Sequence, residues 1–133
     1  MVHNASVSQS RRKMRKAHFT ADANTIRIMM SSRLSKDLRA AYGFKTFPIH
    51  SGDIVSVTTG KFKGKEGKVL TVSRKTSKVT VEGCSNIKAS GGTVLYPIDA
   101  SNLIIKNLAL DNARLQSLDK KKAKVEALKK TSI

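Results

Sequence analysis

The chain has 133 residues, which is the size of one ordinary domain with tails. Its 26 Lys and Arg against nine Asp and Glu give a formal net charge of +17 at pH 7, so we expect a polyanionic partner. The single cysteine, Cys84, excludes an internal disulfide and a zinc site built from thiols. No apolar stretch approaches the roughly 18 residues that a membrane span needs, so we expect no span.

The positive charge is spread over three regions. Residues 1–48 have ten basic against two acidic residues, residues 49–108 have nine against four, and residues 109–133 have seven against three. We interpret these regions as a basic N-terminal extension, a compact β unit and a basic C-terminal tail. Because the excess is not confined to one arm, we expect anion contact over most of the molecule.

The N-terminal region is predicted to contain short helices. Residues 30–43 indicate one with Ser32 as its N-cap and Gly43 at its C-terminal end, and residues 22–29 indicate a weaker helical turn. Residues 1–20 lack the apolar content to fold alone, so we expect them to become ordered on a partner. They precede any acidic residue, which also suits a mitochondrial presequence.

The middle region alternates with a period of two, which predicts strands over 54–57, 67–72, 78–81, 93–96 and 103–105 with a hairpin tip at 89–92. Five short strands with short turns favour a mainly β fold and a small barrel. From residue 111 the pattern is helical, with an apolar stripe of Leu115, Leu118, Val125 and Leu128. The stripe leaves open whether this tail is solvated or docked on RNA.

Residues 49–70 carry the strongest functional signal. They place three glycines between two strands and interleave them with lysines: Gly60, Lys61, Lys63, Gly64, Lys65, Gly67 and Lys68. Glycines permit positive φ and allow backbone N–H groups to approach an anion, while lysines supply neutralising charge. The Gly-Lys-Ser/Thr ending of a nucleotide-binding P-loop is missing. The pattern therefore predicts a loop that contacts a phosphate backbone.

This stretch, with its Gly-Asp turn, alternating strand and Lys-Gly-Lys-x-Gly-Lys-Val run, resembles the KOW motif. Together with residues 11–19, 30–39 and 96–105, it is similar to the large-subunit ribosomal protein called twenty-four in bacteria and twenty-six in eukaryotes. The block before Pro48 resembles the archaeal and eukaryotic cytosolic branch. Two departures from the family stand out: Arg33 replaces a frequent proline, and Asp99-Ala100 replace His-Pro.

The resemblance implies a small SH3-like barrel with helical extensions. It also implies binding to ribosomal RNA of the large subunit near the polypeptide exit tunnel, beside neighbouring ribosomal proteins, and a part in subunit assembly and translation. The expected location is the cytoplasmic ribosome, with nucleolar assembly if the source is eukaryotic. An alternative is a KOW-type transcription elongation module that also binds RNA polymerase, although such factors normally carry a further α/β domain for which 133 residues leave no room.

The candidate RNA-binding residues are basic side chains, one aromatic ring and the loop glycines: Arg11, Arg12, Lys13, Arg15, Lys16, His18, Arg27, Arg33, Lys36, Lys45, Gly60, Lys61, Phe62, Lys63, Gly64, Lys65, Gly67, Lys68, Arg74, Lys75 and Lys88. Phe62 has two interpretations, a stacking platform for a base or a cap on the barrel.

Catalysis and metal binding are not indicated by the sequence. Asp53 and Glu66 are better explained as a turn residue and a strand-edge charge than as a general acid and base, so a nuclease is not favoured. His3, His18 and His50 have no carboxylate or thiol at ligand spacing. We therefore expect a protein that is not an enzyme, with no cofactor, no metal and no small-molecule substrate.

Overall fold

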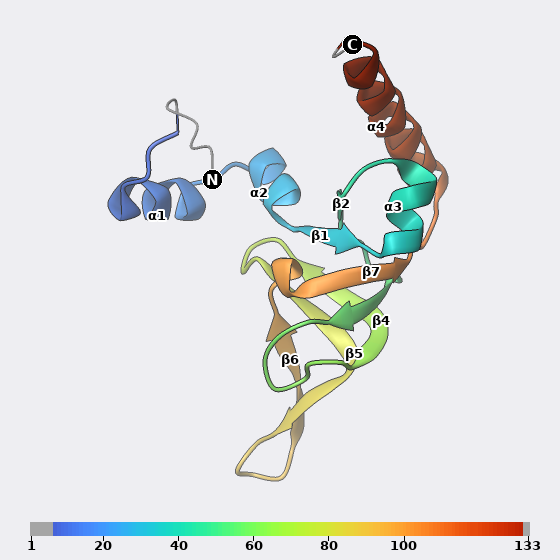
Figure 1. The fold of residues 1–133 in the computed structure, drawn as a ribbon. Coiled ribbons are helices and arrows are strands. Elements are labelled where there is room, and N and C mark those ends of the chain that lie inside the picture. Colours follow the sequence, from blue (N-terminus) through green and yellow to red (C-terminus); the bar gives the residue numbers. More distant parts are fainter. Residues whose placement is uncertain (1–6, 132–133) are drawn as a thin grey trace.

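The computed structural model describes residues 7–131, and Figure 1 shows the helices gathered at one end of the molecule and a β-hairpin extending from the other. The elements in chain order are α1 (Arg11–Phe19), α2 (Ala23–Met29), β1 (Ser31–Leu34), α3 (Lys36–Tyr42), β2 (Thr46–Pro48), β3 (Ile54–Val57), β4 (Glu66–Ser73), β5 (Lys78–Ile87), β6 (Thr93–Ile98), a 3₁₀ turn (Ala100–Asn102), β7 (Leu103–Asn107) and α4 (Asn112–Thr131).

The seven strands form one mixed sheet in the order β2-β1-β7-β3-β4-β5-β6. Neighbouring strands are antiparallel except β1 and β7, which pair in parallel. The prediction of a mainly β unit is confirmed, but a closed barrel is not, because the edge strands β2 and β6 do not pair with each other within residues 7–131. The antiparallel pair of β1 and β2, which are connected through α3, adds to the free edge of β7 instead, so the N-terminal region supplies part of the sheet.

The predicted helix over residues 30–43 is wrong in its first half. Residues 31–34 form β1, and the helix α3 begins at Lys36 with Ser35 as its N-cap, whose side chain accepts a hydrogen bond from the Leu38 N–H at 3.3 Å. Ser32 is fully buried and its hydroxyl donates to the Ala100 carbonyl at 2.6 Å. Residues 33 and 34 pair with Ile104 and Ile105 of β7, and the Ser35 N–H donates to the Ile105 carbonyl at 2.9 Å. This tertiary pairing overrides the helical pattern.

The predicted end of the helix at Gly43 is confirmed, and so is the helical turn predicted over residues 22–29, which forms α2. Gly43 ends α3 with φ +76°, a left-handed conformation that favours glycine. Asp22 caps α2 by accepting a hydrogen bond from the Thr25 N–H, and this bond lowers the pKa of the carboxyl group. These local signals act within one helical turn, which is why the sequence alone shows them.

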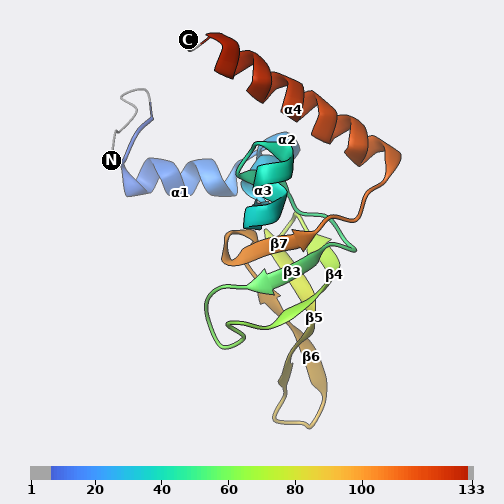
Figure 2. The ribbon, with the colours of Figure 1, turned by 45° about the vertical axis from the view of Figure 1, so that its right-hand side comes forward.

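Alternate side chains of the central strands form the core, as the period of two predicts. Five of them are fully buried: Val55, Val79, Val81, Leu103 and Ile105. The predicted stripe on α4 is only partly correct. Leu118 is buried and Val125 packs against the core, whereas Leu115 and Leu128 are 42% and 62% exposed. One part of α4 therefore docks on the domain and the rest extends away from the sheet (Figure 2). None of the helices in residues 7–131 combines the length and apolar character that a membrane crossing needs.

Candidate nucleic-acid interface

The loop that joins β3 to β4, residues 58–65, runs outward on the side of the sheet away from the helices (Figure 2). Gly60 and Gly64 have φ of +87° and +83°, as the glycine pattern predicted. Short hydrogen bonds hold the loop: the Gly64 N–H donates to the Val57 carbonyl at 2.8 Å, and the Thr58 N–H donates to the Asn102 carbonyl at 2.9 Å. The loop therefore has a defined shape before any ligand binds.

The glycines act differently from the sequence-based interpretation. The N–H groups of Lys63, Gly64 and Lys65 all donate to carbonyls within the loop or β3, so they are not free to cradle an anion. Gly67 lies inside β4, where a Cβ would be 2.5 Å from the Glu82 carbonyl oxygen. Gly60 and Gly64 therefore shape the turn, and Gly67 allows β4 to pack closely on β5.

Phe62 is buried, with 6% of its surface exposed, and belongs to the hydrophobic core. Its ring centroid lies 5.3 Å from that of Tyr96, and the ammonium groups of Lys61 and Lys65 lie 5.7 and 5.2 Å from the ring centroid. Of the two interpretations of this residue, the structure therefore shows the packed one. The ring anchors the loop, and the two ammonium groups beside it also donate to the protein, Lys61 to the Asn86 side chain at 3.0 Å and Lys65 to the Gly83 carbonyl at 3.4 Å.

All the basic candidates from the sequence are exposed, including the six on α1, and none forms an ion pair within residues 7–131: Arg11, Arg12, Lys13, Arg15, Lys16, His18, Arg27, Arg33, Lys36, Lys45, Lys61, Lys63, Lys65, Lys68, Arg74, Lys75 and Lys88. Ion pairs in this part of the chain use other cations. Lys78 pairs with Asp99 at 2.6 Å and Lys106 with Glu66 at 3.2 Å. Asp99 thus neutralises Lys78 on β5.

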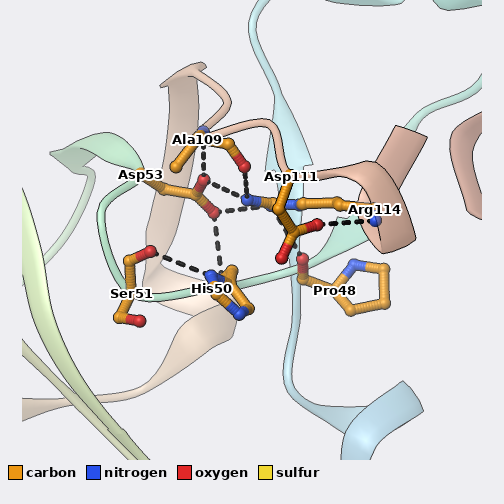
Figure 3. Close-up of polar contacts among 7 residues, drawn as sticks. All are labelled: Pro48, His50, Ser51, Asp53, Ala109, Asp111 and Arg114. Carbon is orange, nitrogen blue, oxygen red and sulfur yellow. Dashed lines mark hydrogen bonds and ion pairs between the residues drawn. The ribbon is translucent and has the colours of Figure 1, made fainter.

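A buried charge cluster beside the sheet was missed by the sequence analysis. Asp53 is fully buried and receives hydrogen bonds from the His50 and Ala109 N–H groups, both at 2.9 Å (Figure 3). Arg114 binds both of its carboxylate oxygens, the second at 2.7 Å, and also donates to the carbonyls of Ala109 and Pro48. Asp53 does sit in the expected turn, but its partner lies 61 residues away.

This cluster ties three segments together at the start of β3: the end of β2, the turn at residues 50–53 and the first turn of α4. Asp111 caps α4 by accepting a hydrogen bond from the Arg114 N–H at 2.6 Å, which orients the arginine. The start of β3 is therefore fixed to the end of β2 and to α4, and nothing local in the sequence signals the pairing.

Other candidates for site chemistry lie apart. Cys84 is fully buried, as the packed interpretation predicted, and burial raises the pKa of its thiol. Residues 7–131 contain no group of three or more His, Cys, Asp or Glu placed to hold a metal ion. His3, one of the three histidines considered, lies outside the described residues.

A small β-sheet protein with a shaped glycine and lysine loop and exposed, unpaired cations is typical of proteins that associate with nucleic acid. Residues 8–121 match the family model that describes the eukaryotic L26 and archaeal L24 ribosomal proteins. This match covers most of the chain, so the chain belongs to this family of ribosomal proteins. Members are structural components of the large ribosomal subunit and not enzymes.

Individual relatives agree with the family match. The chain is 40% identical over 126 residues to large ribosomal subunit protein uL24 of Schizosaccharomyces pombe, covering 95% of this chain and 100% of that protein. It is 42% identical to uL24A of Saccharomyces cerevisiae over 90% of this chain and 94% of that protein. It is 39% identical to uL24 of the archaeon Methanosphaera stadtmanae over 86% and 99%. These matches support the interpretation as a ribosomal protein over the alternative of a transcription elongation module.

Proposed function

We propose that this chain binds ribosomal RNA of the large subunit near the polypeptide exit tunnel, beside neighbouring ribosomal proteins, and supports subunit assembly and translation. Its working location is the cytoplasmic ribosome, and assembly takes place in the nucleolus if the source is eukaryotic. Strands β3 to β7 correspond to the KOW unit, with an SH3-like fold interrupted at one edge by β1. Support for this correspondence comes from three irregularities in strand register, which bend the sheet.

One observation carries the proposal: the candidate cations are exposed and without acidic partners in residues 7–131, while three of the acids are already paired with other cations. Asp53 is buried against Arg114, and Glu66 and Asp99 pair with lysines outside the candidate set. Unpaired cations attract a polyanion by releasing its condensed counterions. The fold therefore presents much of its +17 charge to a phosphate backbone.

RNA binding as a function of salt tests this proposal. If the protein neutralises six or more phosphates, the logarithm of the association constant should fall with the logarithm of salt concentration with a slope of about −4 or steeper. The measurement is a series of titrations with a fragment of large-subunit RNA, accompanied by co-sedimentation with large subunits. An almost flat salt dependence would overturn the proposal.

The N-terminal extension offers a second test. No residue of α1 is buried, and its contacts are local, such as the Arg15 guanidinium 4.9 Å from the Phe19 ring centroid. We expect proteases that cleave after basic residues to cut within 11–16 rapidly in the free protein and slowly in assembled subunits. Equal cutting rates in the two states would contradict an RNA-ordered extension.

A further inference from the structure

A cavity of about 420 Å³ lies where α2, the segment after β2, the β4–β5 turn and the start of α4 meet. Four of its lining residues, Pro48, His50, Asp111 and Arg114, appear in Figure 3. The cavity lies at the helical end of the domain, apart from the β3–β4 loop. Its volume is within the usual range for pockets that hold small organic groups, about 300–1,000 Å³.

Part of the cavity lining is apolar and belongs to the core. Met30, Phe47 and Ile49 line it, and all three are largely buried. The Arg114 guanidinium also lines it, but that group is bound to Asp53 and lies 5.4 Å from the Phe47 ring centroid. An inorganic anion alone would gain nothing from this apolar surface, whereas a flat aromatic group would bury area on it.

The cavity lining includes two arginines from two different elements. Arg27 comes from α2 and Arg74 from the β4–β5 turn, and neither guanidinium has an ion-pair partner within residues 7–131. Asp111 adds one carboxylate to the lining, and only one of its oxygens receives a hydrogen bond from the described chain. The cavity therefore combines an apolar surface, two cations and a hydrogen-bond acceptor.

We propose that this cavity binds one unpaired nucleotide of an RNA chain, with its base against the apolar lining and its phosphate bound by Arg27 and Arg74. The inference rests on the proposed RNA-binding function and deepens it. The Asp111 carboxylate accepts a hydrogen bond from an exocyclic amine, so adenosine, cytidine and guanosine, which carry one, are favoured over uridine. A base pushed out of a helix meets these requirements, because its flat face and its flanking phosphate are presented together.

The test compares two RNA hairpins that differ by a single bulged adenosine, measured by fluorescence anisotropy. We expect the wild-type protein to favour the bulged hairpin by about tenfold, the size of one well-placed base contact. The double variant Arg27→Gln/Arg74→Gln should lose this preference. Its matched control, Lys122→Gln/Lys124→Gln, removes the same charge from exposed positions on α4 outside the cavity and should keep the preference.

A second pair of variants fills the cavity without changing charge. Ala113 is exposed and lines the cavity, so Ala113→Trp should abolish the preference for the bulge, whereas Ala123→Trp, also exposed on α4 but outside the cavity, should retain it. Thermal denaturation of each variant confirms that the fold is intact. Equal binding of the two hairpins by the wild-type protein would overturn the inference and leave the proposed function standing.

Two further outcomes would also overturn it. Inorganic phosphate that removes the bulge preference as effectively as adenosine monophosphate would show a simple anion site. Tight binding of adenosine monophosphate without any bulge preference would show a site for a free nucleotide. Failure of both hairpins to bind at low salt would instead contradict the proposed function itself.

Discussion

The β3–β4 loop carries three lysines, at positions 61, 63 and 65, whose charges have no acidic partner within the described chain. Asp53, only a few residues earlier, is fully buried and bound by Arg114. A charge on the surface loses little hydration and stays available to a partner, whereas a buried charge must be paired and hydrogen-bonded. The exposed lysines are therefore suited to the binding that we propose, whereas the buried pair holds the start of β3 to the first turn of α4.

Breaking the buried pair should produce the largest effect. Asp53→Ala leaves the Arg114 guanidinium buried without its carboxylate and removes the acceptor for two backbone N–H groups, so we expect a loss of about 3–5 kcal/mol in unfolding free energy. Urea denaturation measures this loss. The exposed Asp119→Ala on α4 is the control and should change stability by less than about 0.5 kcal/mol. A similarly small effect at Asp53 would show that the cluster does not hold the fold.

Straining the loop should have a smaller effect on stability and a distinct effect on binding. Gly64 has φ +83° and open space where a Cβ would stand, with no atom within 4 Å, so Gly64→Val should cost about 1–2 kcal/mol through backbone strain alone. Because the turn changes shape, its RNA-binding defect should persist at low salt. Gly92→Val, at an open position without positive φ, is the matched control and should behave as wild type. Wild-type stability and affinity for Gly64→Val would show that the loop is a solvated connector.

Removing one surface charge should leave stability unchanged and weaken only binding. We expect Lys63→Ala to lower RNA affinity by about 1 kcal/mol and to make the salt dependence shallower by about one unit of slope. Lys122→Ala, an exposed lysine on α4 outside the candidate interface, is the comparison. Equal losses for the two variants would indicate that only net charge matters and that the loop has no special place in the interface.

Lys121 lies between the two extremes and should show the smallest effect. Its ammonium donates to the Thr46 carbonyl at 2.6 Å and lies 4.9 Å from the Phe44 ring centroid, and partial burial lowers its pKa. The folded state therefore releases this proton at lower pH than the unfolded state does. Its contribution to stability should rise as pH increases toward the ordinary lysine value of about 10.4.

A comparison with Lys121→Met isolates that contribution. Urea denaturation of both proteins at about pH 8 and about pH 10 should show the wild type gaining stability relative to the variant at the higher pH. The other lysines titrate in both proteins, so their effects cancel in the difference. An unchanged difference between the two proteins would indicate that Lys121 is hydrated like the loop lysines.

Much of this protein is determined by local sequence. The period of two located the five central strands, although β5 extends to Ile87, well past the predicted end at residue 81. Gly43, Gly60 and Gly64 adopt the left-handed conformations that their positions indicated. The excess of Lys and Arg and the KOW pattern pointed to the ribosomal family that the comparisons show. Each of these features depends on composition or on neighbours a few residues away, so no tertiary contact is needed to recognise it.

Other features were decided only when distant segments met. Residues 31–34 became a strand because the edge of β7, some 70 residues later, offered hydrogen bonds. Phe62 was an open choice between stacking and packing until Tyr96 and the core enclosed its ring. Asp53 pairs with Arg114, which is 61 residues away in the sequence. Four segments of the chain surround the cavity that we propose as a nucleotide site. Burial and pairing depend on which surfaces are brought together, and a local pattern of residues carries no information about a partner that far along the chain.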